Sequence, residues 1–319
     1  DESLRFFNEE VLYESAISKM LVDEDIFVTS ENRYALSMLY YAEKRILEFF
    51  TRRKDEKNRK IIATFDEYLI KKQETLGFEL STEQKKAVEL INNGDKTLFL
   101  IGYAGTGKST SSRAILELLE ETMSYDDIMT IALSGIASQR ISDTTGYNSS
   151  TIQSLLMKHK EKDFFPYKAI LLDEASMVNS VTFNQIVSKI DDDTIFIIVG
   201  DDGQLPAIGA GNVLADAIKY ELAPICKLTK IYRQNENQAI AVIANDIRKG
   251  EIPAYKEEYE DFKFVDVSIS NYYSQKNSIS SNDFADLRSK NSEYILNNIL
   301  NISAGYIEEY YDFIKKKKI

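Results

Sequence analysis

The sequence is poor in residues that form covalent or metal-based cross-links. It contains one cysteine, Cys226, and one histidine, His159. A single cysteine excludes a disulfide within the chain, and the two residues together are too small a set for a Cys/His zinc site. The same shortage disfavours catalysis by a Cys–His or Ser–His pair.

Long apolar runs are also missing. No stretch reaches the roughly 18 consecutive apolar residues of a membrane span, and no basic-then-apolar leader is present, so we expect a cytoplasmic location. With 44% hydrophobic residues among 319, the chain can bury a substantial core and is expected to be globular. It begins at Asp1 and ends with Lys315–Lys318 and Ile319, which predicts a fragment.

The charge balance is acidic, with a formal net charge of −12. This disfavours a protein that coats nucleic acid non-specifically, because phosphate binding uses clustered Lys and Arg. A local basic strip on an acidic body remains compatible with a protein that grips and releases a nucleic acid.

Residues 1–78 have helical spacing and predict a small all-helical N-terminal domain. No glycine occurs before Gly77, and apolar residues recur at helical steps. The clearest series is Leu36, Leu39, Tyr40, Ile46, Leu47 and Phe50. The basic run Thr51–Lys60 could contact DNA, although such runs are more often solvated helix ends or loops.

Residues 79–253 alternate short apolar runs with helical stretches, as expected for βαβ units around a parallel sheet. The expected strands are Thr97–Ile101, Ile128–Leu133, Ala169–Asp173, Ile195–Gly200 and Ile225–Leu228, with helices over 107–121, 135–142, 179–190, 211–220 and 237–249. The fold class is therefore α/β. Residues 254–319 predict a linker, rich in Ser, Asn, Lys and Tyr over 268–290, and a last amphipathic helix with Ile295, Ile299, Ile302, Tyr306 and Phe313.

The segment Gly102–Ser109 matches the pattern G-x-x-x-x-G-K-[ST] and lies between an expected strand and an expected helix. Glycines allow backbone N–H groups to surround phosphate, Lys108 reaches the β- and γ-phosphates, and Ser109 offers a hydroxyl to Mg²⁺. A plain glycine-rich turn is the rival interpretation. We expect ATP to contact Gly102, Ala104, Gly105, Thr106, Gly107, Lys108, Ser109 and Thr110.

Polar residues follow two further expected strands. Asp173 and Glu174 end one strand, where Asp173 would hold Mg²⁺ through water and Glu174 would polarise the attacking water. Gln204 follows another strand at the same sheet edge, which predicts a position near the γ-phosphate. A helix N-cap at Asp173 and an Asp-Gly turn before Gln204 are the structural alternatives.

Two more polar residues are candidates on their chemistry. Gln84 opens a helix before the P-loop strand and could hydrogen-bond the edges of adenine. Arg233 follows the last expected strand and could neutralise charge that develops on the γ-phosphate. Each could equally be a surface residue with an ordinary hydrogen bond.

Taken in order, these motifs resemble the leading motifs of superfamily 1 helicases, most closely the RecD-like branch. The matching segments are Thr82–Gln84, Gly102–Thr110, Leu133–Gly135, Thr151–Leu155, Leu172–Met177, Gly200–Pro206 and Tyr232–Gln234. The resemblance implies a RecA-like motor lobe in which Gln84 recognises adenine, Gln204 senses the γ-phosphate and Arg233 acts as an arginine finger. It also implies a 5′-to-3′ single-stranded DNA translocase, alone or as the alpha subunit of an exodeoxyribonuclease V type complex.

The expected DNA contacts depart from the family pattern. Leu133–Ile136 stands where the family has Pro-Thr-Gly and a basic residue, so a phosphate contact is lost or moves to Gln139 or Arg140. Gln153 replaces a histidine, which removes a stacking ring but keeps hydrogen bonding. The DNA candidates are Ser134, Gly135, Arg140, Thr151 and Gln153.

The resemblance implies a second motor lobe that we do not expect within residues 1–319, so we expect these residues to bind nucleotide without unwinding DNA. Two rival functions remain open at this point. One is a P-loop kinase or regulatory ATPase without a nucleic-acid track, and the other is an ATP-binding adaptor subunit of a nuclease complex. No carboxylate cluster outside the ATP site suggests a nuclease centre.

Overall fold

The computed structural model describes residues 14–28 and 33–230, together with residues 243, 247 and 250. By their contacts the residues group into two units, Asp1–Gln234 and Asn235–Ile319. The expected helix over 237–249, the linker over 268–290, the last helix and Arg233 lie outside the described residues, apart from positions 243 and 247 in the first of these. Among the described residues, no helix is long and apolar enough to cross a membrane.

A parallel sheet forms the centre of the first unit. Its strands are β3 (Thr97–Gly102), β4 (Ile128–Ala132), β5 (Ser149–Thr151), β6 (Ala169–Leu172), β7 (Ile195–Gly200) and β8 (Ile225–Leu228). They are arranged in the order β5-β4-β6-β7-β3-β8, and every pairing is parallel. This confirms the α/β class and the expected strands, whereas β5 is an addition. Its sequence Ser-Ser-Thr carries no apolar run that could have revealed it.

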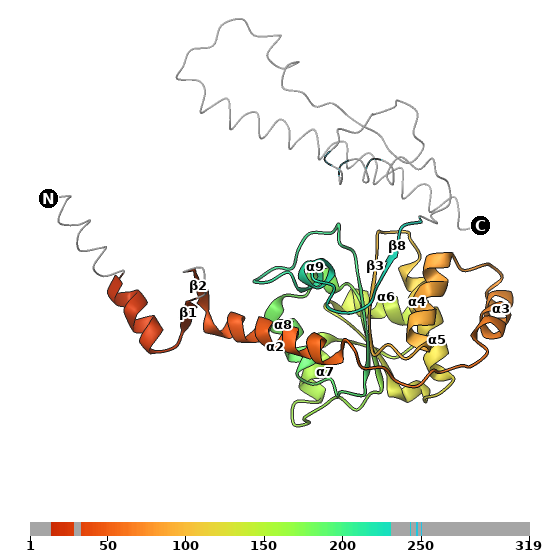
Figure 1. Ribbon diagram of the computed structural model, residues 1–319, viewed down its shortest axis with the longest axis horizontal. Coiled ribbons are helices and arrows are strands. Elements are labelled where there is room, and N and C mark those ends of the chain that lie inside the picture. Colours follow the sequence, from red (N-terminus) through yellow and green to blue (C-terminus); the bar gives the residue numbers. More distant parts are fainter. Residues whose placement is uncertain (1–13, 29–32, 231–242, 244–246, 248–249, 251–319) are drawn as a thin grey trace, which may run out of the picture. The chain divides into compact units, whose positions relative to one another are not determined.

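Alternation along each strand separates two layers of core. In β3, Leu98 and Leu100 belong to one cluster of buried residues, while Phe99 and Ile101 belong to the other. Successive side chains of a strand point to opposite faces, so both faces of this sheet need a cover. Figure 1 shows α3, α4 and α5 on one side of the sheet and α2, α7 and α8 on the other.

Helices cover the sheet on both faces. The helices are α2 (Ser37–Arg53), α3 (Phe65–Leu76), α4 (Thr82–Asn92), α5 (Lys108–Glu120), α6 (Gly135–Thr145), α7 (Ile152–Lys158), α8 (Ser180–Val187) and α9 (Val213–Lys219), with short 3-10 turns η1 (Tyr125–Asp127) and η2 (Ala175–Met177). The helices expected over 107–121, 135–142, 179–190 and 211–220 correspond to α5, α6, α8 and α9.

The leader departs from the all-helical expectation in one respect. Ile26–Val28 and Tyr34–Leu36 pair as antiparallel strands, β1 and β2. Both strands contain β-branched or aromatic residues, which favour extended backbone. The leader is therefore helical with a short hairpin.

Helix α2 belongs to the core of the sheet. Its buried face includes Ile46, Phe49 and Phe50, and Phe50 contacts Phe99 and Phe183 at ring distances of 5.3 and 6.0 Å. Leu47, expected on the apolar face, is 50% exposed. Contacts thus cross residue 78, while the division of the chain at residues 78 and 253 stays a prediction.

Candidate nucleotide-binding site

The P-loop connects β3 to α5, and its backbone requires glycine. Gly105 and Gly107 have φ angles of 84° and 86°, in the left-handed region that residues with a Cβ rarely adopt. Gly107 is the N-cap of α5. The loop therefore ends at a helix N-terminus, where free N–H groups and the helix dipole favour phosphate.

Close packing fixes the start of the same loop. A Cβ added at Gly102 would lie 2.5 Å from Thr106 Oγ1 and 3.0 Å from the backbone oxygen of Leu228. Thr106 is buried, and its hydroxyl donates to the carbonyl of Tyr103 over 2.8 Å. Glycine at position 102 thus lets the loop lie against the neighbouring strand β8.

Lys108 lies over the loop that precedes it. Its Nζ donates to the backbone oxygens of Gly102 and Tyr103 over 2.5 and 3.0 Å. Ser109 and Thr110 follow in the first turn of α5 and are partly exposed. The Lys108 side chain and the Ser109 hydroxyl therefore both lie at the start of α5, which is where phosphate and Mg²⁺ binding would need them.

Asp173 continues directly from β6. Its backbone N–H donates to the carbonyl of Ile131 over 2.8 Å, and its Oδ1 accepts from the backbone N–H of Glu174 over 2.9 Å. Burial raises the pKa of the Asp173 carboxyl and the charge of Glu174 adds to this, whereas the backbone hydrogen bond and the charges of Arg140 and Lys108 oppose it. Strands β3 and β6 both pair in parallel with β7, which places the P-loop and the acidic strand end at the same edge of the sheet.

Glu174 has a strained backbone. Its φ of 52° and ψ of 40° are left-handed, which costs a residue with a Cβ of order 1–3 kcal/mol. Its Oε1 lies 3.5 Å from Arg140 NH1, a nitrogen of the guanidinium expected to contact DNA. The structure therefore connects the candidate water-polarising residue with a candidate DNA contact.

Gln204 is held by η2, which follows the acidic pair. Its Oε1 accepts a hydrogen bond from Ser176 Oγ over 3.2 Å. Because β6 and β7 are neighbours in the sheet, their carboxyl ends bring these residues together. Ser176 was not singled out from the sequence, although it lies within the motif that contains Asp173 and Glu174.

Gln84 contacts the P-loop from α4. Its Oε1 accepts from the backbone N–H of Ser81 over 2.9 Å, which forms a capping box, and its Nε2 lies 3.5 Å from the carbonyl of Gly107. The side chain is buried. The expected contact of Gln84 with adenine stays a prediction, since both ends of the amide already have protein partners.

Four of the DNA candidates lie at or just after the carboxyl ends of β4 and β5, whereas Arg140 lies within α6, and two of the four have local structural roles. Ser134 is the N-cap of α6 and accepts from the N–H of Ala137 over 3.1 Å. Thr151 is the N-cap of α7 and accepts from the N–H of Ser154 over 3.1 Å. Gly135 begins α6, and Gln153 is exposed. Their roles in DNA binding stay predictions.

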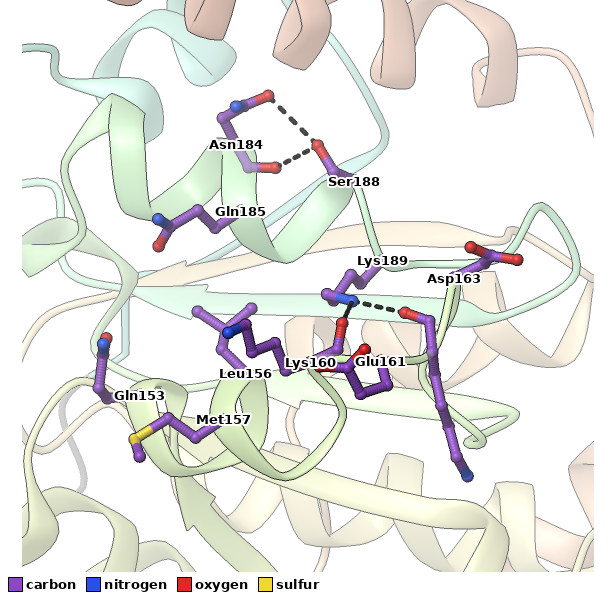
Figure 2. Close-up of a pocket in the computed structure, with 11 residues that line it drawn as sticks. Gln153, Leu156, Met157, Lys160, Glu161, Asp163, Asn184, Gln185, Ser188 and Lys189 are labelled. Carbon is purple, nitrogen blue, oxygen red and sulfur yellow. Dashed lines mark hydrogen bonds between the residues drawn. The ribbon is translucent and has the colours of Figure 1, made fainter.

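A groove of about 710 Å³ begins at Gln153 and runs between α7 and α8 (Figure 2). Lys189 lies in it, but its Nζ donates to the backbone oxygens of Lys162 and His159 over 2.5 and 3.0 Å. Glu161 and Asp163 also line the groove. Acidic side chains among the lysines make it less suitable for a phosphate backbone than a uniformly basic strip.

The oxygen donors present suit Mg²⁺. The Ser109 hydroxyl and the Asp173 carboxylate are hard ligands, and Mg²⁺ is usually held by one or two protein oxygens together with substrate phosphates and water. Among the described residues, no group of three or more His, Cys, Asp or Glu side chains could hold a metal ion by itself. A metal at this edge would therefore be shared with the nucleotide.

Comparison with known families gives this site a context. The model of a family described as an AAA domain matches residues 79–268, which include the P-loop and the acidic strand end. The chain belongs to this AAA-domain family. Proteins named as RecD-type helicases or subunits are among the relatives that this chain resembles.

Two relatives carry RecD-type names. The ATP-dependent RecD2 DNA helicase of Deinococcus radiodurans is 29% identical over 240 residues, covering 71% of this chain and 32% of the relative. The RecBCD enzyme subunit RecD of Mycolicibacterium smegmatis is 27% identical over 209 residues, covering 56% of this chain and 37% of the relative. The chain thus spans about a third of the length of these relatives. A solved structure of Bacteroides Pif1 bound to single-stranded DNA has a TM-score of 0.40 and 23% identity, covering 55% of this chain and 47% of that one.

Proposed function

We propose that this chain is the ATP-binding part of a RecD-like DNA motor, in which ATP hydrolysis drives movement on single-stranded DNA. The observation that carries the proposal is the meeting of the P-loop, the acidic pair and Gln204 at one edge of the sheet. There Ser176 donates a hydrogen bond to Gln204, and the strands that lead to the P-loop and to Asp173, β3 and β6, both pair with β7, the strand that leads to Gln204.

Each residue has a defined task in the proposed reaction. The loop Gly102–Ser109 and Lys108 bind the phosphates, while Ser109 and Asp173 would hold Mg²⁺, which supplies charge neutralisation between the phosphate oxygens. Glu174 orients and polarises the attacking water. Gln204 senses the γ-phosphate. We propose that Arg233, which lies outside the described residues, stabilises the charge that develops on the γ-phosphate.

The proposed motor needs a second side to its cleft. An arginine supplied across such a cleft can be worth about 10³–10⁵ in the rate of phosphoryl transfer. We propose that residues 1–319 bind nucleotide but do not unwind DNA alone. In the whole protein, translocation would run 5′ to 3′. The likeness to RecD-type proteins further supports a role in DNA repair or recombination, partner subunits of a nuclease complex and a cytoplasmic location.

Nucleotide binding by residues 1–319 tests the site. Lys108→Ala should weaken binding of a fluorescent ATP analogue with Mg²⁺ about tenfold to a hundredfold, because a charged hydrogen-bond donor to phosphate is lost. Lys71→Ala, at an exposed lysine of α3, is the matched control and should leave affinity unchanged. Equal affinity of the Lys108→Ala variant and the wild type would exclude the assigned site.

Binding of a labelled single-stranded oligonucleotide tests the DNA track. The wild type should bind it with an affinity that falls as salt rises, since phosphate contacts release counterions. Absence of binding, with and without ATP, would favour a P-loop kinase or regulatory ATPase. Unwinding of duplex DNA by residues 1–319 would refute the need for a second lobe.

A further inference from the structure

The loop that carries Gln204 has no apolar anchor of its own. It connects β7 to α9 over residues 201–212, and its two large aliphatic side chains, Leu205 and Ile208, are 86% and 94% exposed. Hydrophobic burial positions a chain only where apolar side chains leave water. The position of this Gln204 loop therefore depends on its polar contacts.

The start of α8 holds the far half of the Gln204 loop. Asn179 Nδ2 donates to the carbonyl of Ile208 over 3.1 Å, and the backbone N–H of Ser180 donates to the carbonyl of Ala210 over 3.0 Å. Asn179 is also the N-cap of α8, because its Oδ1 accepts from the N–H of Thr182 over 2.9 Å. The first residues of α8 thus start the helix and hold the loop at the same time.

Glu43 of α2 in turn holds Ser180. Its Oε1 accepts from Ser180 Oγ over 3.1 Å, and Ser180 is only 1% exposed. Gly211 lies against this pair, since a Cβ added there would overlap Ser180 Oγ and lie 3.2 Å from Glu43 Oε1. Ser180 therefore gives its N–H to the Gln204 loop and its hydroxyl to α2. Hydrogen bonds to an ionised acceptor such as a carboxylate are roughly twice as strong as neutral ones.

The near half of the Gln204 loop has contacts of its own. Asp202 accepts from Lys227 Nζ of β8 over 2.7 Å, and Gln204 Oε1 accepts from Ser176 Oγ over 3.2 Å. Ser176 lies four residues before Ser180, in the segment that begins with the acidic pair. Gln204 thus lies between two held parts of the loop, and loss of the contacts at Ser180 would leave only the near part held.

We propose that Glu43 is a positioning residue for recognition of the γ-phosphate. Through Ser180 it fixes the far half of the Gln204 loop, and so keeps Gln204 in the place from which it would sense this phosphate. The inference rests on the proposed function and assigns a task in it to the leader helix α2. A plain alternative is that the hydrogen bond between Glu43 and Ser180 only joins α2 to α8 and contributes to stability.

The preference of residues 1–319 for ATP over ADP tests the inference. It is measured as the ratio of the Kd for ADP to the Kd for a slowly hydrolysed ATP analogue, both with Mg²⁺. The wild type should prefer the ATP analogue, and Gln204→Ala should lower the preference about threefold to tenfold, as expected for loss of one hydrogen bond to a charged group. Glu43→Ala should lower it about twofold to fivefold and leave the affinity for ADP unchanged.

Matched variants separate positioning from stability. Glu43→Gln keeps an acceptor oxygen for the Ser180 hydroxyl and should retain most of the preference. Glu48→Ala changes an exposed carboxylate of the same helix and should behave as the wild type.

Two further variants make the result decisive. Ser180→Ala removes the donor from the other side and should reproduce Glu43→Ala, which keeps the test valid if Glu43→Ala does not fold. The double variant Glu43→Ala with Gln204→Ala should lose no more than Gln204→Ala alone, because Glu43 acts only through Gln204.

The outcomes distinguish this inference from the proposed function. A preference that persists in both Glu43→Ala and Ser180→Ala, while Gln204→Ala lowers it, overturns the inference and leaves the ATP site standing. Equal losses of affinity for ADP and for the ATP analogue in Glu43→Ala also overturn it, as do additive losses in the double variant. No preference in the wild type, or a preference that Gln204→Ala leaves intact, contradicts the proposed task of Gln204 and overturns the inference with it.

Discussion

Arg53 is a buried arginine at the amino ends of β3 and β7. It belongs to the basic run Thr51–Lys60, which suggested either a DNA contact or a solvated helix end, yet only 2% of it is exposed. Burial is the main cause that lowers its pKa to about 10. Its guanidinium donates to Thr97 Oγ1 and to the backbone oxygens of Lys96, Asp191, Asp192 and Thr194. Arg53 therefore satisfies strand-end carbonyls, a role that neither interpretation of the run included.

His159 should make stability depend on pH. It is 5% exposed, and neither ring nitrogen has a hydrogen-bond partner among the described residues. Burial lowers its pKa, and the charges of Lys162, Lys158 and Lys189 lower it further. The unfolded chain takes up a proton near pH 6.5 whereas the folded chain does so only at lower pH, so the free energy of unfolding should fall as pH drops below about 6.5.

Urea unfolding of the wild type and of His159→Phe, followed between about pH 5 and 8, measures this effect. The His159 contribution should have a slope of at most about 1.4 kcal/mol per pH unit, present only below pH 6.5. Other groups titrate equally in both proteins, so the difference isolates His159. Parallel curves for the two proteins would show that His159 makes no such contribution.

At the scale of elements, Ser134 and Thr151 have a structural role as the N-caps of α6 and α7. Both residues come from motifs that imply DNA contact, and both side chains accept a backbone hydrogen bond at a helix start. Serine and threonine are preferred N-caps because they satisfy an N–H that the helix leaves free. A serine or threonine at each position is visible in the sequence, but strand β5 and helix α7 were not predicted from it, so Thr151 was not recognised as a helix cap.

Thr151→Ala should lower the free energy of unfolding by about 1 kcal/mol, whereas Thr151→Ser should retain most of it, because serine supplies the same acceptor. Chemical denaturation of the three proteins measures the change, and oligonucleotide binding by the same proteins reports on the DNA role. Unchanged stability of Thr151→Ala would argue that the cap contributes nothing.

At the scale of the whole molecule, α2 and the sheet share one core. Phe49 and Phe50 lie in the same buried cluster as Phe99, Phe183 and Phe196. Helix α2, which lies in the predicted N-terminal domain, thus packs on the sheet of the first unit. Its removal would expose large apolar surface on the sheet.

Phe50→Ala should therefore destabilise the lobe, by about 3–5 kcal/mol, since it removes a fully buried ring and leaves a cavity. Denaturation followed by far-UV circular dichroism should show one transition shifted as a whole. Tyr41→Ala, at a residue of the same helix that is 48% exposed, is the control and should change little. A separate early transition with the main one unmoved would mean that α2 unfolds independently of the sheet.

The sequence by itself determined the P-loop, the acidic strand end and the main strands, because each depends on spacing within a short segment. Periodicity could not select the buried face of α2, since Phe49 and Leu47 differ in exposure only through what packs beside them. The partners of Arg53 and the contact of Glu83 with Thr229, 146 residues away, were likewise decided by tertiary structure. Local patterns encode local backbone, whereas partners distant in the chain are set only when the layers pack together.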